Sequence, residues 1–220
     1  MAATFESMGN SEAAKTHAMR AHEIFSKVYG ERSLEVSSTL TNLGNAEKEL
    51  GELGAAEQHL RLALEIAVEH LGGEHPRVAR YHHNLGRLLE RMDQPEAALD
   101  ELRTALRIRE AAQGPEHPDV CETTTALAAV LVDQGRADEA VAQAERAVRI
   151  AALSEVSPRL REDARWVLAR ALWESTEHRD RTRARQMAEL ARKGLAELKG
   201  TTEELVELDT WLAGHPAGEG

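Results

Sequence analysis

Apolar residues recur along this chain at helical spacing, and the helical segments come in pairs. Within each period, two amphipathic segments alternate with two kinds of break, as a helix–turn–helix unit requires if each helix buries one stripe. The pattern predicts an all-α chain of stacked helix pairs. The expected helices span residues 11–29, 33–50, 54–70, 76–92, 95–112, 118–134, 137–153, 158–175, 180–198 and 202–213.

One offset dominates when the sequence is compared with itself. Gly30, Gly72 and Gly114 lie 42 residues apart. A fixed period of this length is typical of helical repeat arrays, in which each unit buries its apolar face against its neighbours. Four more sets of residues recur at the same interval: Leu43, Leu85 and Leu127; Ala56, Ala98 and Ala140; Ala63, Ala105 and Ala147; Ile66, Ile108 and Ile150.

The breaks between helices also repeat. Short turn-forming clusters at residues 51–54, 93–95 and 134–136 favour antiparallel neighbours. The segments GGEHP (72–76) and GPEHP (114–118) place a glycine where one helix can end and a proline in the first turn of the next. His75 and His117 precede these prolines at the repeat interval, which indicates a role in starting the helix.

Small residues on facing helices predict how each pair packs. Gly44, Gly86 and Ala128 on the first helices are expected to face Ala56, Ala98 and Ala140 on the second helices. With almost no side chain at the contact, two helices can approach closely. A bulky replacement would wedge them apart.

The two ends of the array depart from the pattern. Residues 167–172 match residues 126–131 at an offset of 41, whereas Ala184, Ala188 and Ala191 match their counterparts at 44, which predicts an insertion around residues 177–181. Residues 201–204 offer a capping box before a leucine stripe, so a capping helix is expected there. Residues 11–29 match a second helix whose partner helix is mostly missing. Either the chain is cut from a longer one, or another molecule covers the exposed face of this helix.

These observations divide the chain as follows: a partial repeat at 1–29, full repeats at 30–71, 72–113 and 114–153, a divergent fourth repeat at 154–198, and a capping helix with its tail at 199–220.

Composition narrows the functional classes. The 220 residues are 42% hydrophobic but only 3% aromatic, which favours closely packed helices with small side chains. A net charge of −11 argues against nucleic acid and anionic membranes as partners. The lone Cys121 cannot form an internal disulfide, no signal peptide is visible, and no apolar run approaches the roughly 18 residues that cross a bilayer. We therefore expect a cytoplasmic protein.

The segment HPRVARYHHNLGRLLERMDQPEAALDELRTALRI (75–108) carries HP, then NLG, a turn, EA, and finally AL and I. It resembles the tetratricopeptide repeat in the 42-residue form of kinesin light chains. The resemblance implies a right-handed α–α superhelix of about four helix pairs, with an N-terminal half repeat and a C-terminal capping helix.

Three later segments, ARWVLARALW (164–173), RTRARQMAELAR (181–192) and ELDTWLAGHP (207–216), are similar to C-terminal repeat arrays of bacterial serine/threonine kinases. The excess of arginine over lysine suits a bacterial source.

In this family, the first helices line a concave groove that holds an extended peptide. The resemblance implies a groove that includes Asn42, Asn45, Arg80, His83, Asn84, Arg87 and Arg91. An asparagine amide can pair with a peptide main chain, and arginine can hold a carboxylate with two hydrogen bonds. Equally, Asn42 and Asn84 could pack between neighbouring helices, and the arginines could simply be solvated.

Some family members grip a partner's C-terminal carboxylate with lysine, asparagine and arginine on successive first helices. Asn45 and Asn84 fit that arrangement, but Thr41 stands in place of the first lysine. Glu122 and Ala126 occupy the basic positions of the third helix, so we expect no such clamp. The basic face of the second repeat instead suggests an acidic partner segment.

Trp166, Arg170 and Trp173 share one face of the helix in the fourth repeat. Such a stripe is usually core. Because Trp166 falls one residue off the apolar register, it also remains a candidate for an aromatic anchor in the groove, and Arg170 is a further candidate groove residue.

Catalytic chemistry finds no support in the sequence. The 10 histidines form neither an HExxH helix nor a Cys/His zinc pattern, so we expect no metal. Cys121 takes a small-residue position held by Ser37 and Ala79 in earlier repeats, which favours a packed thiol over a nucleophile. No GxSxG or GxGxxG motif occurs, and we expect no catalytic residue and no cofactor.

The leading hypothesis is a module that binds a peptide or a partner protein, within a larger bacterial signalling protein. The alternatives are a helical regulator or enzyme that acts on a signalling partner, and a scaffold that self-associates through its N-terminal end.

Overall fold

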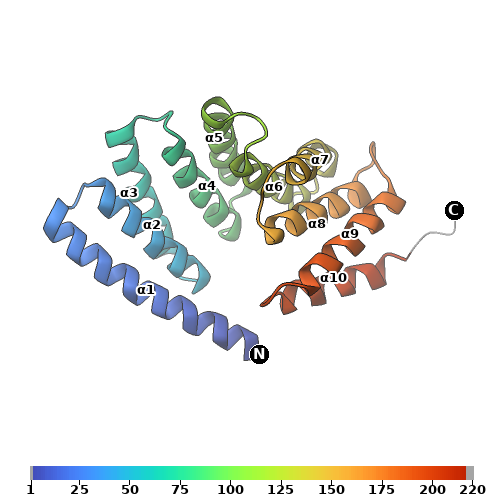
Figure 1. Cartoon of the computed structure of the whole chain (residues 1–220), viewed down its shortest axis with the longest axis horizontal. Helices are drawn as coiled ribbons and strands as arrows, with labels where there is room; N and C mark the ends of the chain where they lie inside the picture. The colour runs from blue at the N-terminus through green and yellow to red at the C-terminus, as the bar shows by residue number, and fades with distance from the viewer. Residues whose placement is uncertain (1, 217–220) are drawn as a thin grey trace. The chain divides into compact units, whose positions relative to one another are not determined.

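The computed structural model of the chain describes residues 2–216, which form ten helices and no strand (Figure 1). The all-α class is thereby confirmed. None of the described helices combines the length and apolar content needed to cross a bilayer. The helices are α1 (Ala2–Tyr29), α2 (Leu34–Glu49), α3 (Leu53–Leu71), α4 (Pro76–Arg91), α5 (Pro95–Gln113), α6 (Pro118–Asp133), α7 (Ala137–Leu153), α8 (Pro158–Glu174), α9 (Arg181–Ala196) and α10 (Thr202–Gly214).

Nine of the ten helices begin and end within two residues of the positions expected from the sequence. The exception is α1, which begins at Ala2 rather than at residue 11. Residues 2–10, which precede the expected helix, instead continue α1. No proline interrupts them, and one glycine within a helix costs only about 1 kcal/mol.

The repeated breaks have the backbone geometry that their residues predict. Gly30, Gly72 and Gly114 have φ of +87°, +80° and +89°, a region that only glycine enters freely. His75 and His117 are helix N-caps, and the Nδ1 atom of each accepts a hydrogen bond of 3.1 Å from the backbone N–H two residues on. Their expected role in starting the helix is confirmed.

The chain divides into two compact units, residues 1–112 and 113–220. In the first unit, α2 packs on α3 and α4 on α5, and the predicted small residues lie at both contacts. A Cβ added to Gly44 would lie 2.8 Å from Cγ of Leu60 and 3.2 Å from the carbonyl oxygen of Ala56. The corresponding distances at Gly86, to Leu102 and Ala98, are also 2.8 and 3.2 Å. Neither contact leaves room for a side chain.

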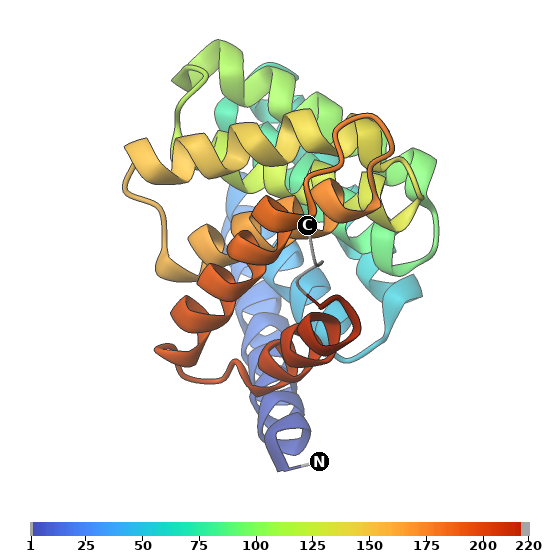
Figure 2. The same cartoon turned by 90° about the vertical axis from the view of Figure 1, so that its right-hand side faces the viewer.

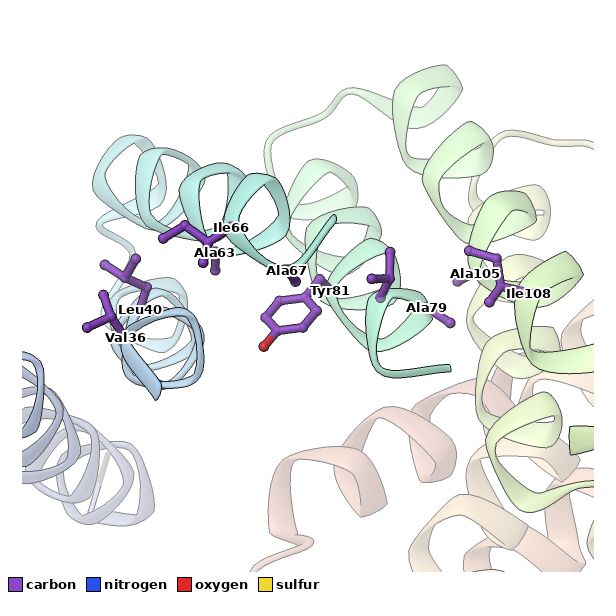
Figure 3. Close-up of a cluster of buried hydrophobic side chains, with 10 residues drawn as sticks. Val36, Leu40, Ala63, Ile66, Ala67, Ala79, Tyr81, Ala105 and Ile108 are labelled. Atoms are coloured by element: carbon purple, nitrogen blue, oxygen red, sulfur yellow. The ribbon is translucent and has the colours of Figure 1, made fainter. Parts of the chain in front are cut away.

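The core of the first unit consists of short aliphatic side chains around one tyrosine (Figure 3). Val36 and Leu40 of α2 lie against Ile66 of α3, and Tyr81 of α4 is fully buried. The Tyr81 hydroxyl is 2.7 Å from Oγ of Ser37, which in turn donates to the carbonyl oxygen of Ala63 at 2.9 Å. The buried hydroxyl groups are therefore satisfied.

In the second unit, α6 packs on α7 and α8 on α9, while α10 lies beside α9 (Figure 2). Leu208 of α10 is fully buried, with Leu205 and Leu212 partly buried around it, so the helix covers α9 as a cap. The predicted capping box is wrong. The Thr201 hydroxyl donates to the carbonyl oxygen of Leu195 at 2.8 Å, because Thr201 is buried against the end of α9.

The insertion in the fourth repeat is the loop between α8 and α9. Six residues separate Glu174 from Arg181, whereas three separate Glu49 from Leu53. The three extra residues equal the shift in offset from 41 to 44.

Asp138 at the start of α7 holds this loop. Its carboxylate accepts hydrogen bonds from the Ser175 hydroxyl, from the Thr176 N–H and hydroxyl at 2.8 Å each, and from the Glu177 N–H at 3.0 Å. These donors lower the pKa of Asp138 well below its usual range.

A pair of alanine substitutions tests the helix contact. Gly54 lies in the first turn of α3, and a Cβ there would touch nothing within 4 Å. Gly54→Ala should therefore raise the free energy of unfolding by up to about 1 kcal/mol through helix propensity. Gly86→Ala should give a smaller gain or a loss, and Gly86→Leu should lower the free energy by about 1–3 kcal/mol through overpacking. Urea denaturation followed by circular dichroism measures all three, and a Gly86→Leu variant as stable as the parent chain would refute the close contact.

Acidification tests the Asp138 anchor. Because its folded-state pKa is depressed, the ionised carboxylate stabilises the fold above the unfolded-state pKa of about 3.9, and that contribution is lost as the pH falls through the folded-state value. Asp138→Asn should therefore be less stable than the parent chain at pH 7, and the difference in melting temperature should shrink towards pH 3. A difference that stays constant over that range would contradict the anchor.

Candidate functional site

The first helices α2 and α4 contact each other and carry most of the residues proposed for a groove. Asn42 is exposed, while Asn45 and Asn84 are partly exposed. Arg91 of α4 reaches Glu49 of α2 at 3.1 Å, so the two helices are also joined by an ion pair. The amides are therefore accessible on neighbouring helices.

Asn42 and Asn45 also line a hollow of about 820 Å³ between α2 and α1. Its other lining residues on α2 are Ala46 and Glu49. Those on α1 are Asn10, Ser11, Ala14, His17, Ala18 and Ala21. The hollow is thus walled mainly by small side chains, with polar groups at its edges.

The structure brings a lysine into the proposed basic face that sequence reasoning missed. Lys48 of α2 lies near Arg87 and Arg91 of α4, and burial, joined by these two positive charges, lowers the pKa of the Lys48 ammonium. Ion pairs of Arg91 with Glu49 (3.1 Å) and Arg87 with Glu90 (3.0 Å) moderate the cluster. Three cations against two carboxylates leave a net charge of +1. A residue of α2 faces a residue of α4 about 40 positions later in the sequence, as in the pair of Glu49 and Arg91. Applied to Arg87 and Arg91, this interval would have identified Lys48 from the sequence.

Two further candidates on α4 differ in exposure. His83 is only 6% exposed, and burial, followed by the positive charges of Arg109, Arg87 and Lys48, holds its pKa well below the usual range. His83 is therefore neutral at pH 7. Arg80 is exposed and lies 5.7 Å from the centre of the Tyr81 ring.

The two candidates in the second unit belong to an aromatic cluster with the capping helix. The rings of Trp166 and Trp173 on α8 each meet Trp211 of α10 edge to face, with centroids 5.3 and 5.4 Å apart. His215 stacks on Trp211 at 4.3 Å. Arg170 lies 6.0 Å from the Trp166 ring and donates to Asp133 at 2.6 Å. Trp166 is partly buried, and its packing is that of a core residue at the edge of the cap.

The remaining chemistry is structural. The Cys121 thiol is buried and donates to the carbonyl oxygen of Ala147 at 3.3 Å, as Ser37 does to Ala63 two repeats earlier. Burial raises the pKa of this thiol to about 11. Across residues 10–216, whose side chains the structure describes, no three histidine, cysteine or carboxylate side chains gather as metal ligands.

Comparison with known proteins agrees with this architecture. A family model described as tetratricopeptide repeat matches residues 1–69, 56–111 and 96–152. A putative kinesin light chain from Podosopora anserina with nearly identical TPR-like repeats is similar in structure, with a TM-score of 0.68 and 23% sequence identity over 88% of this chain and 92% of that one.

Two other solved structures are also similar. BtubC (BKLC) from P. vanneervenii has a TM-score of 0.62 and 15% identity over 99% of this chain and 95% of that one. A Rap protein, solved in complex with competence and sporulation factor, has a TM-score of 0.64 and 16% identity over 95% of this chain and 62% of that one. No curated protein sequence matches the chain.

Modification of Cys121 tests its structural role. Because the thiol is buried and its pKa is raised, a thiol reagent such as DTNB should label the folded chain at pH 8 far more slowly than the unfolded chain. Cys121→Ser should change the free energy of unfolding by no more than about 1 kcal/mol, since a hydroxyl can make the same hydrogen bond. Rapid labelling of the folded chain would show instead that the thiol is accessible.

Proposed function

The chain belongs to the tetratricopeptide-repeat family, and from this membership we propose that it is a protein interaction module whose first helices α2 and α4 bind an extended segment of a partner protein. The candidate residues are Asn42, Asn45, Arg80, Asn84, Arg87 and Arg91, joined by Lys48. Trp166 and Arg170 of the second unit are weaker candidates, because both are engaged with other residues of their own unit.

The observation that carries the proposal is the combination of accessible amides and cations on two adjacent helices. Asn42, Asn45 and Asn84 can each donate to and accept from a peptide main chain, which fixes an extended segment without reading its side chains. Arg87 and Arg91 on α4 are partly exposed and add positive charge, and the mostly buried Lys48 on α2 lies near both. The arrangement suits binding more than chemistry, since no observation on the described residues favours a catalytic role.

The proposed partner segment is acidic. Arg87 and Arg91 are 43% and 44% exposed and both lie near Lys48, so the charge on this part of α4 favours an anion even though the whole chain has a net charge of −11. Such a field raises the association rate and the specificity for complementary segments.

We place the module in the cytoplasm, in a bacterial signalling context. A fold neighbour, the Rap protein, was solved in complex with competence and sporulation factor, which supports this proposal. Thr41, Glu122 and Ala126 replace the basic residues of a carboxylate clamp, so the segment is bound through internal carboxylates rather than through its C-terminus.

Charge reversal tests the proposed surface. An array of 12-residue peptides with acidic, neutral and basic composition should show saturable binding of acidic members to the chain. Arg87→Glu should weaken that binding by about tenfold or more, because an attraction at the centre of the surface becomes a repulsion. Raising the salt concentration should weaken binding to the parent chain.

The matched control is Arg103→Glu. Arg103 lies on the second helix α5, is half exposed, and like Arg87 it pairs with a carboxylate on its own helix. The two variants change the net charge equally, so they separate a local effect from a global one. Equal loss of binding in both, or a preference for basic peptides, would refute the surface.

A further inference from the structure

Helix α1 carries a stripe of residues that the described part of the chain leaves exposed, apart from Ala21, which is partly buried. Ala14, His17, Ala21, Ile24 and Val28 follow one another at spacings of three and four, so they share one face of the helix. Ile24 is 48% exposed and Val28 64%. Exposed apolar side chains that share one helix face are a candidate interaction surface.

The repeats show what covers this face when a pair is complete. Ala14, Ala21 and Ile24 occupy the repeat positions of Ala56, Ala63 and Ile66 in α3, 42 residues later. At each of these positions the side chains in α3, α5 and α7 are at most 1% exposed. The first helices α2, α4 and α6 bury them. In α1, by contrast, Ala14 and Ile24 are exposed and Ala21 is partly exposed.

The hollow of about 820 Å³ lies where such a helix would fit. Ala14, Ala18 and Ala21 of α1 form one wall, and Asn42 and Ala46 of α2 form the other. In the complete pairs the equivalents of the α1 residues are in contact with a first helix, as Ala56 is with Gly44. The hollow therefore corresponds to a vacant helix position rather than to a small-molecule cavity.

We propose that this hollow seats one α-helix of a partner protein, which docks on α1 as α2 docks on α3. The occupant is an amphipathic helix whose apolar stripe covers Ala14, Ala21 and Ile24. This surface shares Asn42 and Asn45 with the acidic-peptide groove but does not include the cations of α4, and its mode of binding is different, namely a helix in a hollow.

The repeats also specify the residue at the centre of the docked helix. Gly44 opposes Leu60 and Gly86 opposes Leu102, whereas in the third pair Ala128 and Ala144 take these two positions. Where the first helix has alanine in place of glycine, the second helix has alanine in place of leucine. Because α1 has Ala18 at the position of Leu60, its occupant should carry alanine where α2 has glycine. A glycine there would leave a void over Ala18.

A polar contact between α2 and α3 indicates a second residue of the docked helix. In the α2–α3 pair, Glu47 is buried and lies 2.7 Å from Nδ1 of His59. His17 of α1 takes the position of His59 and borders the hollow. A glutamate three residues after the central alanine would reach it. In α2, Val36 and Leu40 lie eight and four residues before the glycine and join the core with Ile66, so the occupant needs aliphatic residues at these spacings.

The probe is a fluorescent peptide with the sequence of residues 33–50 and the change Gly44→Ala, stapled on its outer face so that it is helical before binding. Fluorescence anisotropy with the full chain should show saturable binding. The same peptide with Gly44 retained should bind more weakly, and a Glu47→Lys peptide should bind more weakly still. In the chain, Ile24→Arg should weaken binding by about tenfold or more, because it places a charge in the stripe that the bound peptide would bury.

The control is Met19→Arg. Met19 is on the same helix and is 53% exposed, but it lies off the stripe. The Met19→Arg variant should bind the probe as the parent chain does. The Arg87→Glu variant should do so too, because Arg87 belongs to the acidic-peptide groove and not to the hollow. Circular dichroism melting confirms that each variant is folded.

Three results would overturn the proposal. One is the absence of saturable binding by the stapled peptide. Another is an equal loss of binding in Ile24→Arg and Met19→Arg. The third is a concentration-dependent dimer in sedimentation velocity that Ile24→Arg dissociates, because the occupant would then be a second copy of the chain rather than a partner's helix.

Discussion

The rest of the structure depends on one constraint. The two helices of each pair approach closely at positions that carry only glycine or alanine. A Cβ at Gly44 or Gly86 would lie within 3 Å of a leucine on the facing helix, so the two backbones are as near as the leucine permits. The chain achieves this with alanine and leucine rather than with large rings, which explains how 3% aromatic residues suffice for a folded core. It also explains why the 42-residue period is exact through the first three repeats, since a shift of one residue would bring a bulky side chain to the contact.

Features governed by local chemistry could be predicted from the sequence. The glycines with positive φ, the histidine N-caps before proline and the small residues at the contacts each follow from one repeated position. The three-residue insertion followed from a change in offset. Features governed by packing outside the repeat pattern could not be predicted. The capping box at Thr201 failed because burial against α9 offered its hydroxyl a nearer acceptor.

The candidate site divides in the same way. The sequence placed Asn42, Asn84 and Arg87 on first helices, but exposure depends on neighbouring helices, and His83 proved to be buried among cations. Lys48 was missed because it joins Arg87 and Arg91 only across a helix interface. The role of Trp166 depended on Trp211, an aromatic residue 45 positions later on a helix outside the repeat period.

Both proposed surfaces involve α2. A helix seated against α1 would cover Asn42 and Asn45, which line the same hollow, while leaving the α4 cations in place. The central claim is that α1 is the second helix of a repeat whose first helix is missing from the isolated chain. Hydrogen–deuterium exchange on the isolated monomeric chain tests this claim most directly. The amides of α1 around Ala21 and Ile24 should exchange clearly faster than those of α3 around Ala63 and Ile66, although the two segments have nearly the same repeat pattern. Equal protection of both segments in the monomer would contradict this interpretation.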